Sequence, residues 1–269
     1  MKKALNIWKL LQKVRSTNPI IHNMTNYVAM NQTANALLAL GASPIMAHAL
    51  QELPEIIEQS SALVVNIGTL DSVMITSIKV ACSAAKQANI PVVLDPVGSG
   101  FTTFRTKTVQ KFIESGYIDI VRCNPSEAAS IINANVHSHG VDSAISSTEV
   151  VDLALQIAAK YNITLCITGK KDFVIDPDSK VHTVSNGHPF MRKTTGMGCT
   201  ASAIAAAFAT CTNDHSAACL AAMVVMGICG EKAASQSKGP GFFQAKFLDE
   251  LYQLDEHTIN TYMKLEENA

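Results

Sequence analysis

Charged residues are scarce in this sequence. Asp, Glu, Lys and Arg make up 16% of its 269 residues, against about 25% in an average soluble domain. Hydrophobic residues make up 48%, and a compact chain of this size removes about 70 to 75% of its unfolded surface from water. The chain can therefore bury a large core without disulfides or metal ions. The shortage of charge indicates that another subunit covers part of its surface.

Concentrated positive charge is also absent. Lys and Arg number 21 and Asp and Glu number 22, giving a net charge of -1, and no basic run is longer than two residues. Because binding to nucleic acid needs a cationic face, we expect no nucleic-acid partner.

The seven cysteines form no CxxC pair and no metal-ligand spacing with the eight histidines. This pattern indicates reduced thiols of a cytoplasmic protein. The first fourteen residues are interrupted by Lys9 and Lys13 and lack a small-residue cleavage site, so they predict an amphipathic helix and not a signal peptide. The apolar stretches 201–211 and 217–230 are shorter than the roughly 18 to 20 residues that span a bilayer. We therefore expect no membrane partner.

Short β-branched runs alternate with longer helical segments, as in α/β proteins. The runs predict strands at 44–46, 62–67, 91–94, 118–121 and 163–168. Helices are predicted at 27–40, 52–59, 72–88, 103–115, 125–132, 148–160, 200–211, 215–236 and 242–264. Several strands are apolar on both faces, which is typical of parallel strands covered by helices.

The pattern changes after Thr168. Short strands at 172–176 and 180–184 flank the turn residues Pro177-Asp178-Ser179, which predicts an antiparallel addition at one end of the sheet. No linker or internal repeat divides the chain. We therefore predict one domain, residues 1–269, folded as a three-layer α/β/α sandwich with a mostly parallel central sheet.

In such sheets, ligands bind beyond the carboxyl ends of the strands. Asp95 ends one apolar run and is followed by Gly98 and Gly100. Its carboxylate could hold Mg²⁺ directly or through water, and the glycines would let the backbone approach a ligand. An ordinary Asp-Pro turn explains the same residues equally well.

A second strand end carries Arg122, followed by Asn124, Pro125 and Glu127. Asn as N-cap, Pro at the first helical position and Glu in a capping box form a good helix start without any function. The helix start does not explain Arg122, a permanent charge for which phosphate oxygens are a natural partner. Glu127 can also order Mg²⁺-bound water while it caps the helix.

The third place is a glycine-bearing turn that leads into an Ala-rich helix. Backbone N–H groups can converge there on one anion, which the helix dipole also favours, so we predict an anion hole formed by Gly196, Met197, Gly198 and Cys199. A helix start lowers the pKa of a thiol, which would suit Cys199 as a base or nucleophile. A plain turn with a small buried Cys is the alternative. The phosphate-binding pattern G-x-x-x-x-G-K-[ST] is absent, so ATP would be bound without a P-loop.

Taken in order, these segments resemble the hydroxyethylthiazole kinase family of the ribokinase-like fold, over nearly the whole chain. The matching segments are 22–47, Asp95-Pro-Val-Gly98, Asn124-Pro-Ser-Glu127, Asn186-Gly-His-Pro189 and Gly196-Met-Gly-Cys199. The first and last of these are specific to the family, whereas Asn-x-x-Glu is shared by the wider fold. Met197 stands where the family usually has Thr, so a possible hydroxyl contact to phosphate is lost while the backbone anion hole remains.

The resemblance implies ATP-dependent phosphorylation of the hydroxyl of 4-methyl-5-(2-hydroxyethyl)thiazole, with Mg²⁺ as cofactor, for thiamine biosynthesis or salvage. The roles it implies are ATP contact by Arg122 and Thr168, Mg²⁺ organisation by Asp95 and Glu127, thiazole contact by Met46, Gly196 and Asn26, and a base at Cys199. It also implies a homotrimer with the thiazole site between subunits.

Three other functions remain open at this point. A kinase of the same fold could act on another heterocyclic alcohol, such as a hydroxymethylpyrimidine. The protein could instead be a nucleotide- or thiazole-responsive binding protein without turnover. Such a protein would need no base beside an anion hole. A hydrolase with a Cys nucleophile would need a His or an acid beside Cys199, and the sequence places neither there.

Overall fold

A computed structural model describes residues 5–135 and 147–268 of the chain. In these residues, nine strands form one sheet in the order β2-β1-β3-β4-β5-β6-β7-β8-β9. The strands are β1 (Ile20–Met24), β2 (Ser43–Ile45), β3 (Ala62–Asn66), β4 (Val92–Asp95), β5 (Ile120–Cys123), β6 (Thr164–Ile167), β7 (Asp172–Ile175), β8 (Val181–Val184) and β9 (Leu265–Asn268). Neighbouring strands from β2 to β6 are parallel. The pairs from β6 to β9 are antiparallel, which confirms the predicted antiparallel addition.

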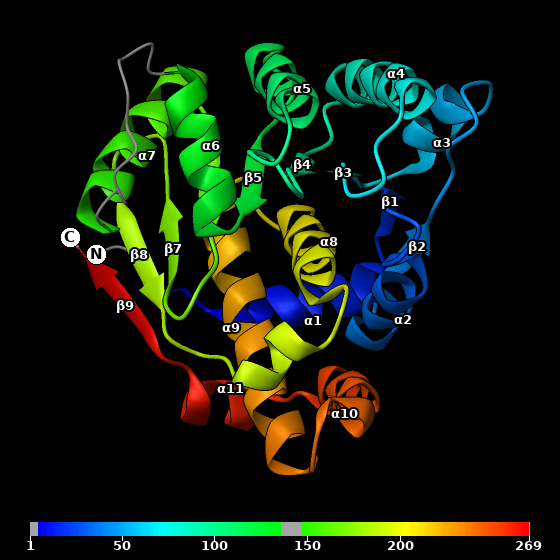
Figure 1. Cartoon of the computed structure of the whole chain (residues 1–269). Helices are drawn as coiled ribbons and strands as arrows, with labels where there is room; N and C mark the ends of the chain where they lie inside the picture. Colours follow the sequence, from blue (N-terminus) through cyan, green and yellow to red (C-terminus); the bar gives the residue numbers. More distant parts are fainter. Residues whose placement is uncertain (1–4, 136–146, 269) are drawn as a thin grey trace.

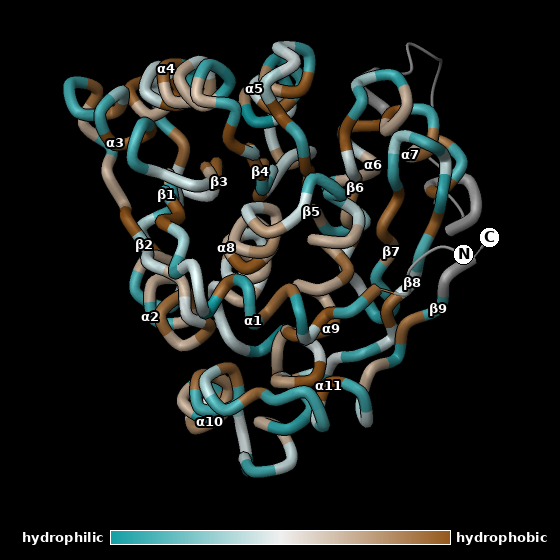
Figure 2. Tube along the Cα trace, turned by 180° about the vertical axis from the view of Figure 1, so that it is seen from behind, coloured by the Kyte–Doolittle hydropathy of each residue, from teal (hydrophilic) through white to brown (hydrophobic). Residues whose placement is uncertain are grey.

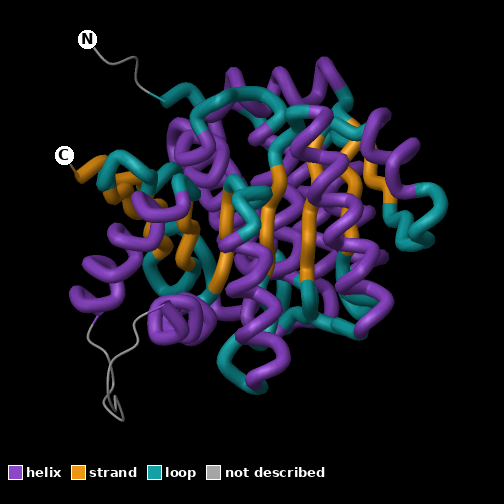
Figure 3. Tube along the Cα trace, turned by 90° about the horizontal axis from the view of Figure 1, so that it is seen from above, coloured by secondary structure: helices purple, strands orange, loops and turns teal. Residues whose placement is uncertain are grey.

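Helices cover both faces of the sheet (Figure 1). They are α1 (Ile7–Thr17), α2 (Met30–Leu40), α3 (Leu53–Gln59), α4 (Ser72–Ala88), α5 (Thr103–Glu114), α6 (Pro125–Asn135), α7 (Ser147–Tyr161), α8 (Met197–Ala209), α9 (His215–Ser235), α10 (Pro240–Gln253) and α11 (Glu256–Tyr262), with a 3₁₀ turn at Pro189–Lys193. Successive side chains of a strand point to opposite faces. In β3, Val64 packs into the core with α1, α2, α8, α9 and α10, whereas Leu63 and Val65 pack into the core with α3 to α7. The sheet between two helical layers, seen from above in Figure 3, confirms the three-layer sandwich.

One helix of the described residues, α9, is long and apolar enough to cross a membrane. Its most apolar window is 83% buried inside the protein, and it packs against α8 and α10. Figure 2 shows α8 and α9 near the centre of the molecule, with α10 at its lower edge. The apolar sequence of α9 is therefore explained by its place in the core.

Three predicted helix boundaries are wrong, and two strands are missing from the prediction. The helix predicted at 242–264 is two helices, because the Asp255 side chain accepts a hydrogen bond from Thr258 N at 2.8 Å and starts a new helix. The helix predicted at 27–40 begins at Met30, after a turn in which Asn26 accepts from Ala29 N. The helix predicted at 200–211 begins three residues earlier, at Met197. Strands β1 and β9 were not predicted.

Candidate active site

The carboxyl ends of β1, β3, β4, β5 and β6 lie next to one another, because these strands are parallel and adjacent in the sheet. They carry Asn26, Asn66, Asp95, Arg122 and Thr168, each at a strand end or just beyond it. The amino end of α8 meets the same edge, since α8 contacts β3 and β4. Five strands and the start of α8 therefore contribute to one polar cluster.

At its centre lies a buried ion pair. Arg122 Nη2 donates to both carboxylate oxygens of Asp95, at 2.9 and 3.0 Å, and the two residues are 6% and 0% exposed. Asp95 Oδ2 also accepts from Asn66 Nδ2 at 2.9 Å and from the Ser202 hydroxyl at 2.8 Å. Removing either ion would leave the other charge buried and unpaired, at a cost of about 3–5 kcal/mol.

Three protein groups fix the Arg122 guanidinium in place. Besides Asp95, its Nε donates to Ser202 Oγ at 3.0 Å and its Nη1 donates to Thr168 Oγ1 at 3.1 Å. Burial opposes its charge, but Asp95 and then Glu127 more than offset this effect and raise the pKa of Arg122. A Cβ atom at Gly198 would lie 2.9 Å from Arg122 Nη2. The positive charge therefore sits directly against the backbone of the glycine loop.

That loop is the first turn of α8. Gly196 is the N-cap, in the left-handed region at φ 79°, and the first helical hydrogen bond runs from Thr200 N to Gly196 O. The N–H groups of Met197, Gly198 and Cys199 precede this bond and so stand outside the helical ladder. Three N–H groups without a helical partner therefore lie at this turn, next to Arg122, and the anion hole itself stays a prediction.

Cys199 is tied to the ion pair through two amides. Asn26 Nδ2 donates to Cys199 Sγ at 3.1 Å and to Asn66 Oδ1 at 2.9 Å, and Asn66 donates in turn to Asp95. The prediction that the helix start lowers the pKa of this thiol is wrong. Burial raises the pKa of Cys199, the charge of Asp95 raises it further, and the hydrogen bond from Asn26 offsets only part of the rise.

Glu127 forms the predicted capping box. Its Oε2 accepts from Asn124 N at 2.9 Å, while Asn124 Oδ1 accepts from Glu127 N at 2.9 Å. Its Oε1 accepts from Gly98 N at 3.0 Å and so joins this helix to the Asp95 loop. Burial raises the pKa of Glu127, partly offset by the two N–H donors.

The two acids fit Mg²⁺ to different degrees. Each Glu127 oxygen accepts one hydrogen bond from the protein, so each retains a lone pair that can accept from metal-bound water. Asp95 Oδ2 accepts three hydrogen bonds and is saturated, whereas Asp95 Oδ1 accepts one, from Arg122, so Asp95 as a whole is more fully engaged by the protein than Glu127. The described residues contain no group of three His, Cys, Asp or Glu side chains that could hold a metal ion. The site fits a cation held through water, and Asp95 is placed to orient Arg122.

Of the three predicted thiazole contacts, Asn26 lies in this cluster, and Met46 and Gly196 lie at its margin. Met46 follows β2, the edge strand, and the next residue is held by His22, whose Nε2 lies 2.9 Å from Ala47 O. Burial lowers the pKa of His22, so the neutral ring donates this bond. Gly196 faces α2, where a Cβ atom would lie 3.1 Å from Gln32 Oε1. No hydrogen bond links Met46 to the described residues of the polar cluster.

Sequence reasoning missed two members of the cluster, Asn66 and Ser202. Asn66 ends an apolar strand at the ligand-binding edge, the same signal that selected Asp95. Ser202 lies four residues after Gly198 and so one turn further along the helix, on the same side; counted from the glycine loop, it could have been found. Neither sequence position predicts which neighbouring strand the side chain of Asn66 or Ser202 contacts.

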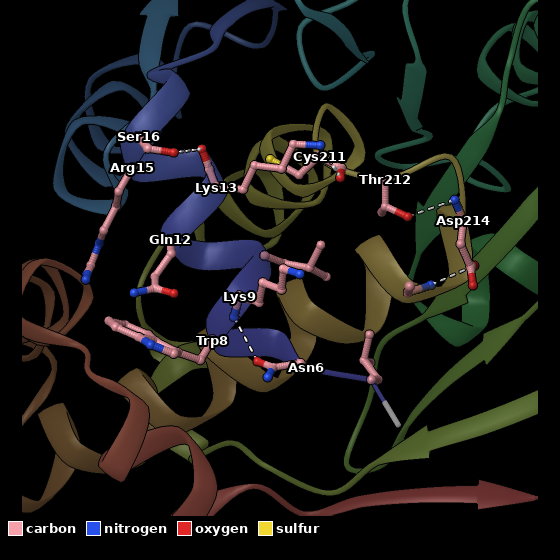
Figure 4. Close-up of a pocket in the computed structure, with 13 residues that line it drawn as sticks. Asn6, Trp8, Lys9, Gln12, Lys13, Arg15, Ser16, Cys211, Thr212 and Asp214 are labelled. Atoms are coloured by element: carbon pink, nitrogen blue, oxygen red, sulfur yellow. Dashed lines mark hydrogen bonds between the residues drawn. The ribbon is translucent and has the colours of Figure 1, made fainter. Parts of the chain in front are cut away.

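A groove in the described part of the chain lies away from this cluster. About 930 Å³ in volume, it runs between α1 and the turn joining α8 to α9, beside Trp8, Lys9, Lys13, Cys211 and Asp214 (Figure 4). None of the predicted site residues lines it. Lys13 Nζ donates to Cys211 O at 2.9 Å, so this lysine joins α1 to the turn after α8.

Comparison with known proteins assigns the chain to a family. A model of the hydroxyethylthiazole kinase family matches residues 11–257, which is most of the chain. The chain belongs to the hydroxyethylthiazole kinase family. A hydroxyethylthiazole kinase of Syntrophus aciditrophicus (strain SB) is 45% identical over 261 residues, covering 97% of this chain and 96% of the relative.

Solved structures agree with this assignment. The hydroxyethylthiazole kinase protein of Pyrococcus horikoshii OT3 superposes with a TM-score of 0.90 at 39% identity, covering 98% of this chain and 99% of that one. The pyridoxal kinase of Staphylococcus aureus in complex with AMP-PCP and pyridoxal has a TM-score of 0.61 at 15% identity, covering 79% of this chain and 87% of that one. The second likeness shows the fold alone, which is ribokinase-like as expected.

Proposed function

We propose that this member of the hydroxyethylthiazole kinase family transfers the γ-phosphoryl group of ATP to the primary hydroxyl of 4-methyl-5-(2-hydroxyethyl)thiazole. The product, a thiazole phosphate, would serve thiamine biosynthesis or salvage. The observation that carries the proposal is the first turn of α8, where free N–H groups lie directly against the Arg122 guanidinium and beside Cys199. A site of this kind stabilises negative charge that develops next to a proton acceptor.

Arg122 and Thr168 are the proposed ATP contacts. They are hydrogen-bonded to each other at 3.1 Å, and Asp95 and Ser202 hold the guanidinium so that no reorganisation is needed when phosphate arrives. The N–H groups from Met197 to Cys199 would face the transferred phosphoryl group. Phosphoryl transfer passes through a loose transition state in most analyses, so positioning and electrostatics supply most of the acceleration.

Cys199 is the proposed base, accepting the proton of the substrate hydroxyl as the new P–O bond forms. Because burial raises the pKa of this thiol, the thiolate is a minor form at neutral pH. In a loose transition state the hydroxyl loses its proton late, so a weak base is tolerable. The role of Cys199 is therefore to assist, and the donors around the phosphate carry most of the catalysis. Met46, Gly196 and Asn26 would contact the thiazole alcohol.

Mg²⁺ is the proposed cofactor, and when bound it would supply positive charge that offsets the charge of the phosphate groups. Glu127 would hold it through water, with its carboxylate oriented by Asn124 and Gly98. Asp95 would act mainly by orienting Arg122. This division follows from the number of hydrogen bonds that each carboxylate already accepts.

A homotrimer with the thiazole site between subunits is the proposed assembly. Four large apolar side chains near this edge of the sheet are exposed, namely Tyr27 at 64%, Val28 at 65%, Val73 at 73% and Phe101 at 89%. They follow β1, β3 and β4, the strands that carry Asn26, Asn66 and Asp95. A second subunit would cover these side chains and close the site from water. The seven free cysteines support the proposed cytoplasmic location.

Release of ADP, measured with a panel of thiazole and pyrimidine alcohols, tests the proposal. We expect saturable turnover with the hydroxyethylthiazole and much weaker turnover with a hydroxymethylpyrimidine. Preference for the pyrimidine would assign the protein to another substrate of the same fold. Nucleotide binding without turnover on any alcohol would make it a binding protein.

A further inference from the structure

The side-chain amides of Asn66 and Asn26 form a chain of hydrogen bonds between Asp95 and Cys199. The direction of these hydrogen bonds is set at the Asp95 end. A carboxylate paired with Arg122 accepts hydrogen bonds and has none to donate. Asn66 must therefore turn its NH₂ group toward Asp95 Oδ2, at 2.9 Å. Asn66 Oδ1 then faces the other way and accepts from Gly68 N at 2.9 Å. Two independent partners fix the same orientation of the Asn66 amide.

This orientation passes on to Asn26. Asn66 Oδ1 accepts from Asn26 Nδ2 at 2.9 Å, and Asn26 Oδ1 accepts from Ala29 N at 3.0 Å. The Asn26 amide is thus held from both of its ends, and its second N–H group points at Cys199 Sγ, 3.1 Å away. If the amide were reversed, an oxygen would face both the sulfur and Asn66 Oδ1.

The backbone makes room for this arrangement. A Cβ atom at Gly68 would lie 2.8 Å from Asn26 Cβ and 2.9 Å from Asn26 Nδ2, too close for either atom to stay in place. Gly68 therefore both donates to Asn66 and leaves space for the Asn26 side chain. The backbone after β3 therefore accommodates the side-chain amides of both Asn26 and Asn66.

We propose that Asn66 is a positioning residue of this site, which, held by Asp95 and Gly68, keeps the N–H group of Asn26 directed at Cys199 Sγ. A donor aimed at sulfur stabilises the thiolate more than the thiol, so Asn66 favours the form of Cys199 that can accept a proton. The charged groups that face Cys199 are Asp95, which raises its pKa, and Arg122, which lowers it; the Asn66 amide also lowers this pKa directly, by less than Asn26 does. The inference rests on the proposed role of Cys199 as base, but its test does not.

The test is the rate at which iodoacetamide alkylates Cys199 at pH 7.5. The other six cysteines are buried, whereas Cys199 is partly exposed, so it reacts first, and peptide mass spectrometry identifies it. We expect Asn66→Ala to slow this alkylation about threefold to tenfold, because the sulfur loses part of a charge-stabilising hydrogen bond. Asn23→Ala is the matched control: Asn23 is a buried asparagine of β1 whose Nδ2 donates to Ile21 O, and we expect less than a twofold change.

A double-mutant cycle separates positioning from a general loosening of the site. If Asn66 acts through Asn26, then Asn66→Ala should add less than a further twofold in an Asn26→Ala background. Wild-type alkylation in Asn66→Ala, or fully multiplicative effects in the double variant, would overturn the proposal. Gly68→Ala provides a second test if Asn66→Ala does not fold. The added Cβ atom displaces Asn26 and leaves Asn66 in place. This variant should slow alkylation as well, and a wild-type rate in it would count against the proposal.

Turnover assays of the same variants distinguish this inference from the proposed function. Slower alkylation of Cys199 together with unchanged turnover would support the positioning of the sulfur and remove Cys199 from the role of base. Unchanged alkylation together with normal kinase activity would have the opposite meaning, leaving the proposed function intact and rejecting the role of Asn66.

Discussion

Among single residues, Cys199 gives the sharpest prediction. Cys199→Ala should lower kcat by about one to three powers of ten, toward the low end because the transition state is loose. Cys199→Asp should remain active, since a carboxylate in place of the thiol can also accept the proton. Steady-state kinetics with the thiazole alcohol, alongside equilibrium binding of both substrates, separate chemistry from affinity.

The pH dependence of these variants follows from the raised pKa of Cys199. A base must be deprotonated, so wild-type kcat should rise between pH 7 and pH 9 as the thiolate fraction grows. The Asp variant carries a carboxylate that is already ionised in this range, so its profile should be flat. Wild-type turnover in the Ala variant would make Cys199 a packing residue.

Asp172 predicts a pH effect on stability. It begins β7, accepts from Gly169 N at 2.8 Å, and burial raises its pKa from 3.8 to about 6, while Gly169 and Arg122 offset part of the rise. An acid with a raised folded-state pKa stabilises the fold below its unfolded pKa and loses that contribution as the pH rises through about 6. Asp172→Asn retains an oxygen for Gly169 N and should therefore raise the free energy of unfolding at pH 7.5, by at most roughly 3 kcal/mol, and change it little at pH 4.5.

Urea titrations at both pH values check this prediction. Asp178→Asn is the control, because the Asp178 side chain is 81% exposed and should give no pH-dependent gain. An Asp172→Asn variant less stable than wild type at pH 7.5 would show that the charge of Asp172 is needed opposite Arg122.

Residue types and strand positions were enough to predict most of the cluster. Asp95, Arg122 and Cys199 stood out because a charge or thiol followed an apolar run or a glycine turn. Asn66 and Ser202 did not, because one neutral polar residue at the end of a strand or inside an Ala-rich helix is common. Their importance follows from their hydrogen bonds to Asp95 and Arg122, which join elements far apart in the chain.

Among the elements, the start of α8 is the one that the account depends on most. Gly196 adopts φ 79°, and a Cβ atom there would lie 3.1 Å from Gln32 Oε1 and 3.5 Å from Ala29 Cβ. Gly196→Ala should therefore move the first turn of α8 and lower kcat at least tenfold, besides the roughly 1–2 kcal/mol that a left-handed Ala costs.

Gly116→Ala is the matched control for this loop. Gly116 has a similar φ of 70°, but a Cβ atom there would meet nothing within 4 Å. Thermal unfolding should show a comparable loss of stability in both variants, and turnover should fall only in Gly196→Ala. Equal loss of turnover in both, or in neither, would contradict the role of the loop.

The strands show why some elements could not be predicted. The parallel strands β3 to β6 are continuous apolar runs and were recognised. Strand β1 was missed because His22 and Asn23 interrupt its apolar pattern, although both are buried and His22 Nε2 is hydrogen-bonded to Ala47 O. Strand β9 is polar, and it is paired with β8 at the edge of the sheet. Such an edge strand has no apolar signature of its own.

At the scale of the whole molecule, one sheet separates the two cores of the described residues, and a single domain over residues 1–269 stays a prediction. The exposed apolar side chains beside the site lead to a prediction about assembly. Light scattering after size exclusion should give the mass of a trimer. Phe101→Asp should lower that mass and reduce turnover together, because a charge would replace an 89% exposed aromatic side chain at the proposed subunit contact.

Tyr252→Asp is the control for assembly. Tyr252 is 76% exposed on α10, so this variant adds the same charge on another surface and should remain trimeric and active. A wild-type protein that is monomeric and fully active at nanomolar concentration would refute a site shared between subunits.

The most direct measurement follows the γ-phosphoryl group itself. ATP labelled with ¹⁸O in that group is supplied with equal amounts of the hydroxyethylthiazole and a hydroxymethylpyrimidine, and the products are identified by mass spectrometry. The account predicts labelled phosphate on the thiazole alcohol, formed at the same rate as ADP, with little label on the pyrimidine. Label found mainly on the pyrimidine, or released as inorganic phosphate without a phosphate ester, would contradict it.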